Sequence, residues 1–139
     1  MGPILITGGS GQLAQALMAK AGLATPGGRA LLGVGRPAFD FDRPDLLRGL
    51  LAGLAPSLIV NAAAYTAVDR AETDAEAAAR ANAEGPAVLA AYCAQAGIPL
   101  IHVSTDYVFD GDKGAPYLET DPPRPTGVYG ATKLAGERA

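Results

Sequence analysis

A glycine-rich turn near the start of the chain constrains the fold more than any other feature. Residues 3–7 form a short apolar run, residues 8–11 read Gly-Gly-Ser-Gly, and a helical pattern follows from Gln12. This order predicts a buried strand, a tight turn and a helix, which together direct backbone N–H groups and the positive end of a helix dipole toward one point. Such a turn suits a pyrophosphate, but the same spacing also occurs in turns that only join a strand to a helix.

The rest of the chain repeats this alternation of apolar run and helical pattern. Further strands are expected at 30–34, 58–61 and 100–104. Helices are expected over 11–21, from 42–45 to about 54, over 75–96 and from 128 onward, with loops at 22–28 and 110–127. Continuous apolar strands separated by helices indicate an α/β fold of the Rossmann type, a doubly wound parallel sheet. We expect the strand order 3-2-1-4 and a ligand at the carboxyl ends of the strands.

Composition narrows the class of protein. The chain has 139 residues, enough for one domain, and its net charge of −3 argues against an electrostatic nucleic-acid binder. No apolar run reaches the ~18 residues of a membrane span, and the first residues lack the basic start of a signal peptide. The single cysteine, Cys93, excludes an internal disulfide. We therefore expect a cytoplasmic protein with no membrane partner.

The last expected helix has no stop signal before Ala139. We expect residues 1–139 to be an NAD(P)-binding Rossmann domain that is truncated before a C-terminal substrate region. Such a piece should show little or no turnover by itself. It should also carry an exposed sheet edge and an uncovered face, a surface that could favour a homodimer or aggregation.

Side chains after the second and third strands bear on the cofactor. Gly35-Arg36 follows the second strand where an acid would bind a ribose 2′-hydroxyl, so the arginine favours NADP(H) over NAD(H), although a solvated surface arginine is the alternative. Asp40 and Phe41 come next, with Phe41 or the adjacent backbone expected beside the adenine. Small residues at 62–64 would let the backbone approach a bound ligand.

Polar side chains near the fourth strand and the last helix bear on catalysis. Thr105 follows the fourth strand, where hydroxyls face the ligand crevice in this architecture. Tyr129 and Lys133 have the i, i+4 spacing that places both on one helix face. A lysine ammonium stabilises a nearby phenolate, which makes the tyrosine a usable general acid–base. Taken alone, this spacing is also typical of an amphipathic helix face.

Four stretches together resemble the extended short-chain dehydrogenase/reductase superfamily, and within it the dTDP-4-dehydrorhamnose reductase family. They are residues 7–13, 60–72, 104–111 and 128–137. The resemblance implies reduction, with NADPH, of the 4-keto group of a nucleotide-sugar, dTDP-4-dehydro-L-rhamnose, to dTDP-L-rhamnose. Two alternatives stay open: a non-catalytic NADP-binding subunit like the regulatory subunit of methionine adenosyltransferase, and a related sugar-nucleotide epimerase. The presence of Thr105, Tyr129 and Lys133 disfavours the first, and the residues 104–109 disfavour the second.

The resemblance also implies roles for individual residues. Tyr129 would be the proton donor, Lys133 would bind the nicotinamide ribose, Thr105 would bond the reacting oxygen, and Asp106 would contact the sugar. With the positions chosen above, the expected cofactor-binding residues are Gly8, Gly11, Gln12, Leu13, Arg36, Asp40, Phe41, Ala62, Ala63, Ala64, Tyr65, Thr66, Tyr129 and Lys133.

Some residues depart from the family pattern or carry a plain structural interpretation. Ala16 stands where some members have a glutamate for a magnesium-linked dimer, so no metal site is expected. His102 is expected to be a buried, hydrogen-bonded strand residue, and Cys93 to be core. Glu72, like Asp69, is expected on the polar face of a short helix. Asn82 resembles an asparagine that supports the active site through the long helix.

Overall fold

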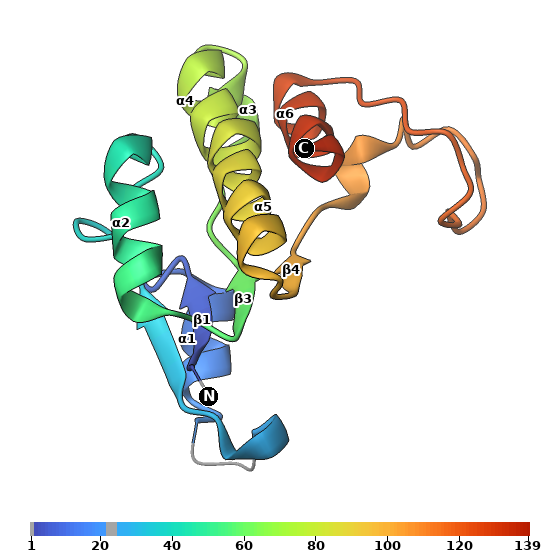
Figure 1. Cartoon of the computed structure of the whole chain (residues 1–139). Coiled ribbons are helices and arrows are strands. Elements are labelled where there is room, and N and C mark those ends of the chain that lie inside the picture. Colours follow the sequence, from blue (N-terminus) through green and yellow to red (C-terminus); the bar gives the residue numbers. More distant parts are fainter. Residues whose placement is uncertain (1, 22–24) are drawn as a thin grey trace.

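The computed structural model describes residues 2–21 and 25–139 and contains one parallel sheet of four short strands (Figure 1). The strands are β1 (Ile4–Thr7), β2 (Leu31–Val34), β3 (Leu58–Asn61) and β4 (Leu100–His102). The helices are α1 (Gln12–Met18), α2 (Pro44–Leu54), α3 (Val68–Ala71), α4 (Ala75–Ala79), α5 (Gly85–Ala96) and α6 (Val128–Arg138). Short 3₁₀ turns η1 (Pro26–Gly28) and η3 (Asp106–Val108) and a π-helical segment η2 (Arg80–Glu84) complete the chain. The expected α/β class is confirmed.

The strand order is β2-β1-β3-β4, so the expected order 3-2-1-4 is wrong. After β2 the chain passes through α2 and returns as β3, which pairs with the other side of β1. In the described residues no further strand lies outside β2. The connections therefore reverse direction between β1 and β3. In such sheets the ligand crevice lies at the carboxyl ends of the strands beside this reversal, and β1 and β3 end there at Thr7 and Asn61.

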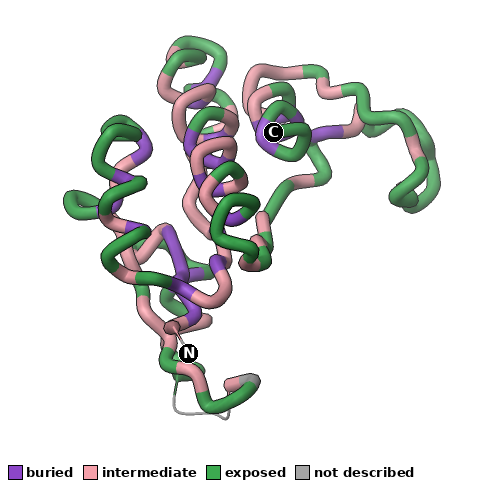
Figure 2. Tube along the Cα trace, viewed as in Figure 1, coloured by how far each residue is buried: buried purple, intermediate pink, exposed green. Residues whose placement is uncertain are grey.

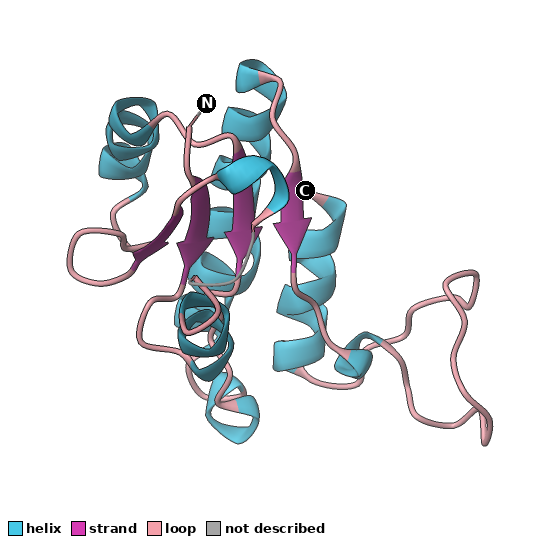
Figure 3. Cartoon of the chain, turned by 90° about the horizontal axis from the view of Figure 1, so that it is seen from below, coloured by secondary structure: helices cyan, strands magenta, loops and turns pink. Residues whose placement is uncertain are grey.

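The two faces of the sheet are covered unequally (Figures 2 and 3). Leu5 and Ile59 point to the face covered by α2 and α5, where Leu47 and Leu89 complete a core of fully buried side chains. Ile6 lies on the opposite face, which α1 covers over β1 and β2. Ile101 shares that opposite face, because its register partner Val60 pairs in turn with Ile6, and it is 52% exposed. The expected sheet edge at β4 and its uncovered face are thus present.

The helix expected over 75–96 is interrupted by η2. Pro86 has no N–H to donate to the carbonyl of Asn82, four residues earlier, so the regular bonding pattern cannot run through this point. Helix α6 packs there instead, since a Cβ on Gly136 would lie 2.0 Å from that carbonyl oxygen. The interruption therefore allows α6 to pack closely against the long helical segment.

Strand β4 ends two residues before its expected end at 104. The carbonyl oxygen of Val103 accepts a hydrogen bond from Lys133 Nζ at 2.6 Å. This backbone group therefore bonds to a side chain of α6. The loop 110–127 is present as expected and extends away from the sheet (Figure 1). The expected loop at 22–28 lies partly outside the described residues.

Candidate functional site

The glycine turn forms the floor of the site. Gly8 has φ +82°, and a Cβ there would lie 2.9 Å from the backbone of Ala62, so this position requires glycine. The turn is closed by a bond from Gly11 N to Gly8 O of 2.7 Å. Gly11 precedes α1, and no side chain of the described residues caps this helix start, which leaves its first N–H groups without a side-chain partner.

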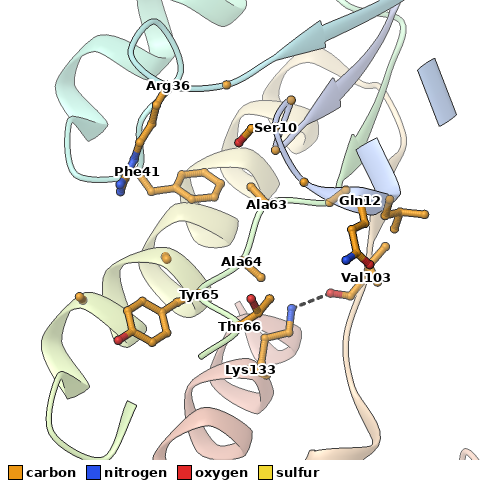
Figure 4. A pocket seen from close by; sticks show the side chains of 18 of the residues that line it. Ser10, Gln12, Arg36, Phe41, Ala63, Ala64, Tyr65, Thr66, Val103 and Lys133 are labelled. Atoms are coloured by element: carbon orange, nitrogen blue, oxygen red, sulfur yellow. Dashed lines mark hydrogen bonds between the residues drawn. The ribbon is translucent and has the colours of Figure 1, made fainter. Parts of the chain in front are cut away.

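A cleft of about 990 Å³ runs across the carboxyl ends of the strands (Figure 4). Arg36 and Phe41 lie toward one end, and Gln12, Val103 and Lys133 toward the other. Of the expected cofactor-binding residues, all but Asp40 line this cleft. Thr105 and Asp106 are not among its lining residues, and Val103 and Ser104 line it just before them.

Charged side chains form a bridged cluster at the first end of the cleft. Arg36 donates from Nε to Asp40 Oδ1 at 3.0 Å and from Nη2 to Asp42 Oδ2 at 2.9 Å. Asp42 Oδ1 accepts from Arg80 Nε at 2.8 Å, and this hydrogen bond holds the pKa of the Asp42 carboxyl below its usual value. Arg36 remains 67% exposed, so its guanidinium can still reach a ligand.

The side chain of Phe41 is buried and does not project into solvent. Its ring meets Phe39 edge-on, with centroids 5.4 Å apart, and a Cβ on Gly85 would lie 2.3 Å from ring atoms. Only 7% of Phe41 is exposed, yet it lines the cleft. Its ring therefore forms part of a fixed apolar wall at the Arg36 end.

A chain of polar side chains joins three strand ends. Thr7 Oγ1 donates to Asn61 Oδ1 at 2.5 Å, and Asn61 Nδ2 lies 2.9 Å from His102 Nδ1. The backbone N–H of Ala63 bonds to both Thr7 Oγ1 and Asn61 Oδ1 at 3.3 Å. This chain fixes the start of the loop that follows β3, and so the edge of the cleft.

His102 differs from expectation in one respect. Its Nδ1 accepts from Asn61, but within residues 2–21 and 25–139 the buried Nε2 has no hydrogen-bond partner. The expectation of a fully hydrogen-bonded histidine is therefore wrong. Burial, and then the charge of Lys133, lower the pKa of His102, which favours the neutral ring.

The other end of the cleft carries Tyr129 and Lys133. Lys133 is only 2% exposed and is held by Val103 O, and its burial lowers the pKa of the ammonium while Glu137 opposes that shift. The Tyr129 ring meets Tyr107 edge-on, with centroids 5.5 Å apart. Both side chains line the cleft, in agreement with the shared helix face that their i, i+4 spacing predicted.

Thr105 begins the η3 turn. Its Oγ1 accepts from the backbone N–H of Tyr107 at 3.2 Å and donates to Asp106 Oδ1 at 3.3 Å. Its hydroxyl is therefore engaged within its own turn.

Asn82 connects the loop after β3 to the last helix. Its side chain accepts from Tyr65 N at 2.8 Å and donates to Tyr65 O at 3.1 Å and to Thr132 Oγ1 at 3.2 Å. The Tyr65 hydroxyl donates to Asp74 at 3.2 Å, and burial together with this carboxylate raises the pKa of Tyr65. Tyr65 is thus fixed at both its backbone and its hydroxyl.

Sequence reasoning did not assign Asp42, Arg70 or Asp74 to the site, although all three line the cleft. It also missed Arg80, which does not line the cleft but bonds to Asp42. The i, i+4 pairing of Arg70 with Asp74 is readable from the sequence. Asp42 and Arg80 are 38 residues apart, so no local pattern marks that pair.

A parallel sheet with a glycine turn at its reversal point, and a Tyr-x-x-x-Lys helix closing the same cleft, defines the short-chain dehydrogenase/reductase class. Comparison with known proteins is more specific. The sequence model of the family described as "RmlD substrate binding domain" matches residues 1–139, and the chain belongs to this family.

Individual relatives agree with this assignment. The chain is 45% identical, over 98% of its length, to dTDP-4-dehydrorhamnose reductase of Burkholderia thailandensis, of which it covers 44%. It resembles the structure of dTDP-4-dehydrorhamnose reductase (rfbD) from Bacillus anthracis in complex with NADP, with a TM-score of 0.90 and 33% identity, covering 99% of this chain and 48% of that one. The ortholog from Clostridium acetobutylicum gives a TM-score of 0.91 at 34% identity, covering 98% and 48%. The chain therefore spans less than half the length of these relatives.

Two further findings concern the described residues alone. None of their helices is both long enough and apolar enough to cross a bilayer. No three of their His, Cys, Asp or Glu side chains gather as a metal site would require.

Proposed function

We propose that this chain is the cofactor-binding part of an NADPH-dependent reductase that converts the 4-keto group of dTDP-4-dehydro-L-rhamnose to the alcohol of dTDP-L-rhamnose. The observation that carries the proposal is the single cleft that joins the glycine turn to Tyr129 and Lys133. The names of the relatives support the substrate, and the NADP in the Bacillus anthracis structure supports the cofactor. The names of the relatives favour a reductase over a regulatory subunit or an epimerase.

The described residues fit a dinucleotide. Gly8 lets the turn pack closely against the backbone of Ala62, and the start of α1, which has no side-chain cap, offers N–H donors to the pyrophosphate. We assign Arg36, at one end of the cleft, to bind the 2′-phosphate, and Phe41 to form the apolar wall beside the adenine. We assign the remaining expected residues, Ala62–Thr66 among them, to the edge that the cofactor crosses.

The chemistry follows from the other end of the cleft. Bound NADPH supplies the hydride that adds to the C4 carbonyl carbon of the sugar. Tyr129 donates its phenolic proton to the oxygen at which negative charge develops, a contribution typically worth about 10²–10⁴-fold. Lys133, held by Val103 O, keeps further N–H groups for the nicotinamide ribose. In this scheme Thr105 exchanges its bond to Asp106 for one to the reacting oxygen, and Asp106 contacts the sugar.

The test uses the full-length protein, dTDP-4-dehydro-L-rhamnose and the absorbance of NADPH. We expect turnover with the wild type and a loss of about 10²-fold or more in Tyr129→Phe, with NADPH binding retained. A full-length protein that binds NADPH with Tyr129 intact but never reduces this sugar would refute the proposal.

The same assay on residues 1–139 alone tests the proposed domain limits. Little or no turnover is expected, and steady-state reduction by this piece would overturn the assignment of the substrate region to the rest of the protein. The cytoplasmic location, the homodimer and the absence of a nucleic-acid partner stay predictions.

A further inference from the structure

Glu72 makes a long-range contact that its place in the sequence does not suggest. It lies directly after the short helix α3, and its Oε1 accepts a hydrogen bond from the backbone N–H of Val128 at 2.8 Å, across 56 residues. Val128 is the first residue of α6. A carboxylate from one segment thus satisfies a free N–H at the start of another segment's helix.

The start of α6 needs such an external cap. Gly127 precedes the helix and has no side chain to bond the first N–H groups. A Cβ on Gly127 would lie 2.8 Å from Glu72 Oε1, so glycine leaves the space that the carboxylate occupies. The negative charge also interacts favourably with the positive end of the helix dipole.

The backbone at Glu72 is held in place by burial and by a hydrogen bond. Ala71, the last residue of α3, is completely buried, and the backbone N–H of Glu72 bonds to Asp69 O at 3.3 Å. The carboxylate itself is near the surface, so its effect on overall stability should be modest. The hydrogen bond from Glu72 matters instead because the turn that it caps carries Tyr129.

The residue after Val128 is Tyr129. Within the described parts of the chain, the other side-chain hydrogen bonds that tie α6 to its neighbours begin a turn later, at Thr132 and Lys133. Packing against η3 and the hydrogen bond of Glu72 therefore hold the first turn, from which the phenol projects.

We propose that Glu72 is a positioning residue that holds Tyr129 at the reacting oxygen by capping α6. The inference rests on the proposed function, because it assigns Tyr129 the role of proton donor. It replaces the interpretation of Glu72 as an ordinary polar residue of a surface helix. Misplacing a catalytic group by about 1 Å can cost about 10²-fold in rate, so a loosened first turn should be visible in kcat.

The experiment compares three variants of the full-length protein. Glu72→Ala removes the acceptor, and Glu72→Gln retains an amide oxygen that can accept from Val128 N–H while losing the charge. Asp69→Asn is the matched control, because it removes an exposed carboxylate from the same short helix. For each variant, kcat, KM for the sugar nucleotide, the Kd of NADPH and the hydrogen exchange of the first-turn amides of α6 are measured.

Glu72→Ala should lower kcat by about 10–100-fold, leave the Kd of NADPH within about threefold, and speed exchange of the first-turn amides. Glu72→Gln should recover most of the lost kcat, and Asp69→Asn should match the wild type. A merely stabilising residue would instead lower the melting temperature without changing kcat per folded molecule. Wild-type kcat in Glu72→Ala, or no rescue by glutamine, would overturn the proposal.

Hydrogen exchange separates this proposal from the proposed function. If the wild type does not reduce the sugar nucleotide, the proposed function fails by itself, and unchanged first-turn exchange in Glu72→Ala would then refute the capping role as well. If the wild type is active but exchange and kcat are both unchanged in Glu72→Ala, only the positioning role fails.

Discussion

Gly130 is a point of close approach between α6 and the η3 turn. A Cβ built on Gly130 would lie 2.2 Å from the carbonyl oxygen of Tyr107 and 3.1 Å from Cβ of Pro125, whereas ordinary contact begins at 3.4 Å. Gly130→Ala must therefore push the first turn of α6 away from η3 by about 1 Å. Tyr129 is the preceding residue and moves with this turn.

This displacement sets the expected magnitude. A shift of about 1 Å in a catalytic group costs about 10²-fold, so kcat should fall by that factor while the Kd of NADPH changes little. Overpacking costs about 1–3 kcal/mol, and the helix preference of alanine over glycine returns about 1 kcal/mol. We expect the free energy of unfolding to fall by about 1 kcal/mol, which leaves the variant folded.

The assay is steady-state reduction of dTDP-4-dehydro-L-rhamnose by the full-length protein, together with urea denaturation. Gly49→Ala is the matched control, because a Cβ on this glycine of α2 meets nothing within 4 Å. It should stabilise the protein by about 0.5–1 kcal/mol and leave kcat unchanged. A folded Gly130→Ala protein with wild-type kcat would show that the spacing of α6 and η3 does not position Tyr129.

Three further predictions concern charge. Arg36→Glu should shift preference from NADPH toward NADH, because a carboxylate repels a 2′-phosphate and accepts from a ribose hydroxyl; fluorescence titrations that show the same preference as the wild type would remove Arg36 from the site. Asp42→Asn should raise the preference for NADPH by about fivefold, since one negative charge near the 2′-phosphate is lost, whereas Asp45→Asn, on the exposed first turn of α2, should not. Burial and the charge of Lys133 lower the pKa of His102, so the unfolded chain takes up a proton below about pH 6.5 while the folded protein resists it, and stability falls as the pH falls through that window. His102→Gln should flatten the fall of the urea midpoint between about pH 7 and 5, and an unchanged slope would assign it to other groups.

The parts of the site that sequence could predict are those that follow from the parallel sheet. The glycine turn, the small residues after β3 and the Tyr-x-x-x-Lys helix each have a local pattern. Once the strands are parallel, their carboxyl ends must meet along one edge. Gly11, Ala64 and Lys133 therefore line one cleft although more than 50 residues separate each from the next.

The parts that sequence could not predict depend on contacts between distant segments. Glu72 reads as a polar residue of a short helix, and only the packing of α3 beside α6 brings it to Val128. The predicted strand order was wrong for a related reason. The alternation of strands and helices in the sequence does not reveal on which side of β1 the strand after α2 pairs. Thr105 is a different case. Its role at the reacting oxygen is expected from resemblance, whereas the hydrogen bonds of its hydroxyl in the structure stay within its own turn.

The loop between β3 and α4 connects the two halves of the cleft physically. Its Ala63 amide is bonded to the end of β1, the Tyr65 backbone is held by Asn82, and Glu72 caps the helix of Tyr129. We therefore expect a shift of this loop at the glycine turn to strain the hydrogen bond between Glu72 and Val128 that, in our proposal, positions Tyr129. Because close-packed interiors transmit strain, we expect the glycine turn to have a second role. Besides the anion site that we propose for it, the turn packs at Gly8 against one end of the loop, whose other end caps the helix of Tyr129 through Glu72.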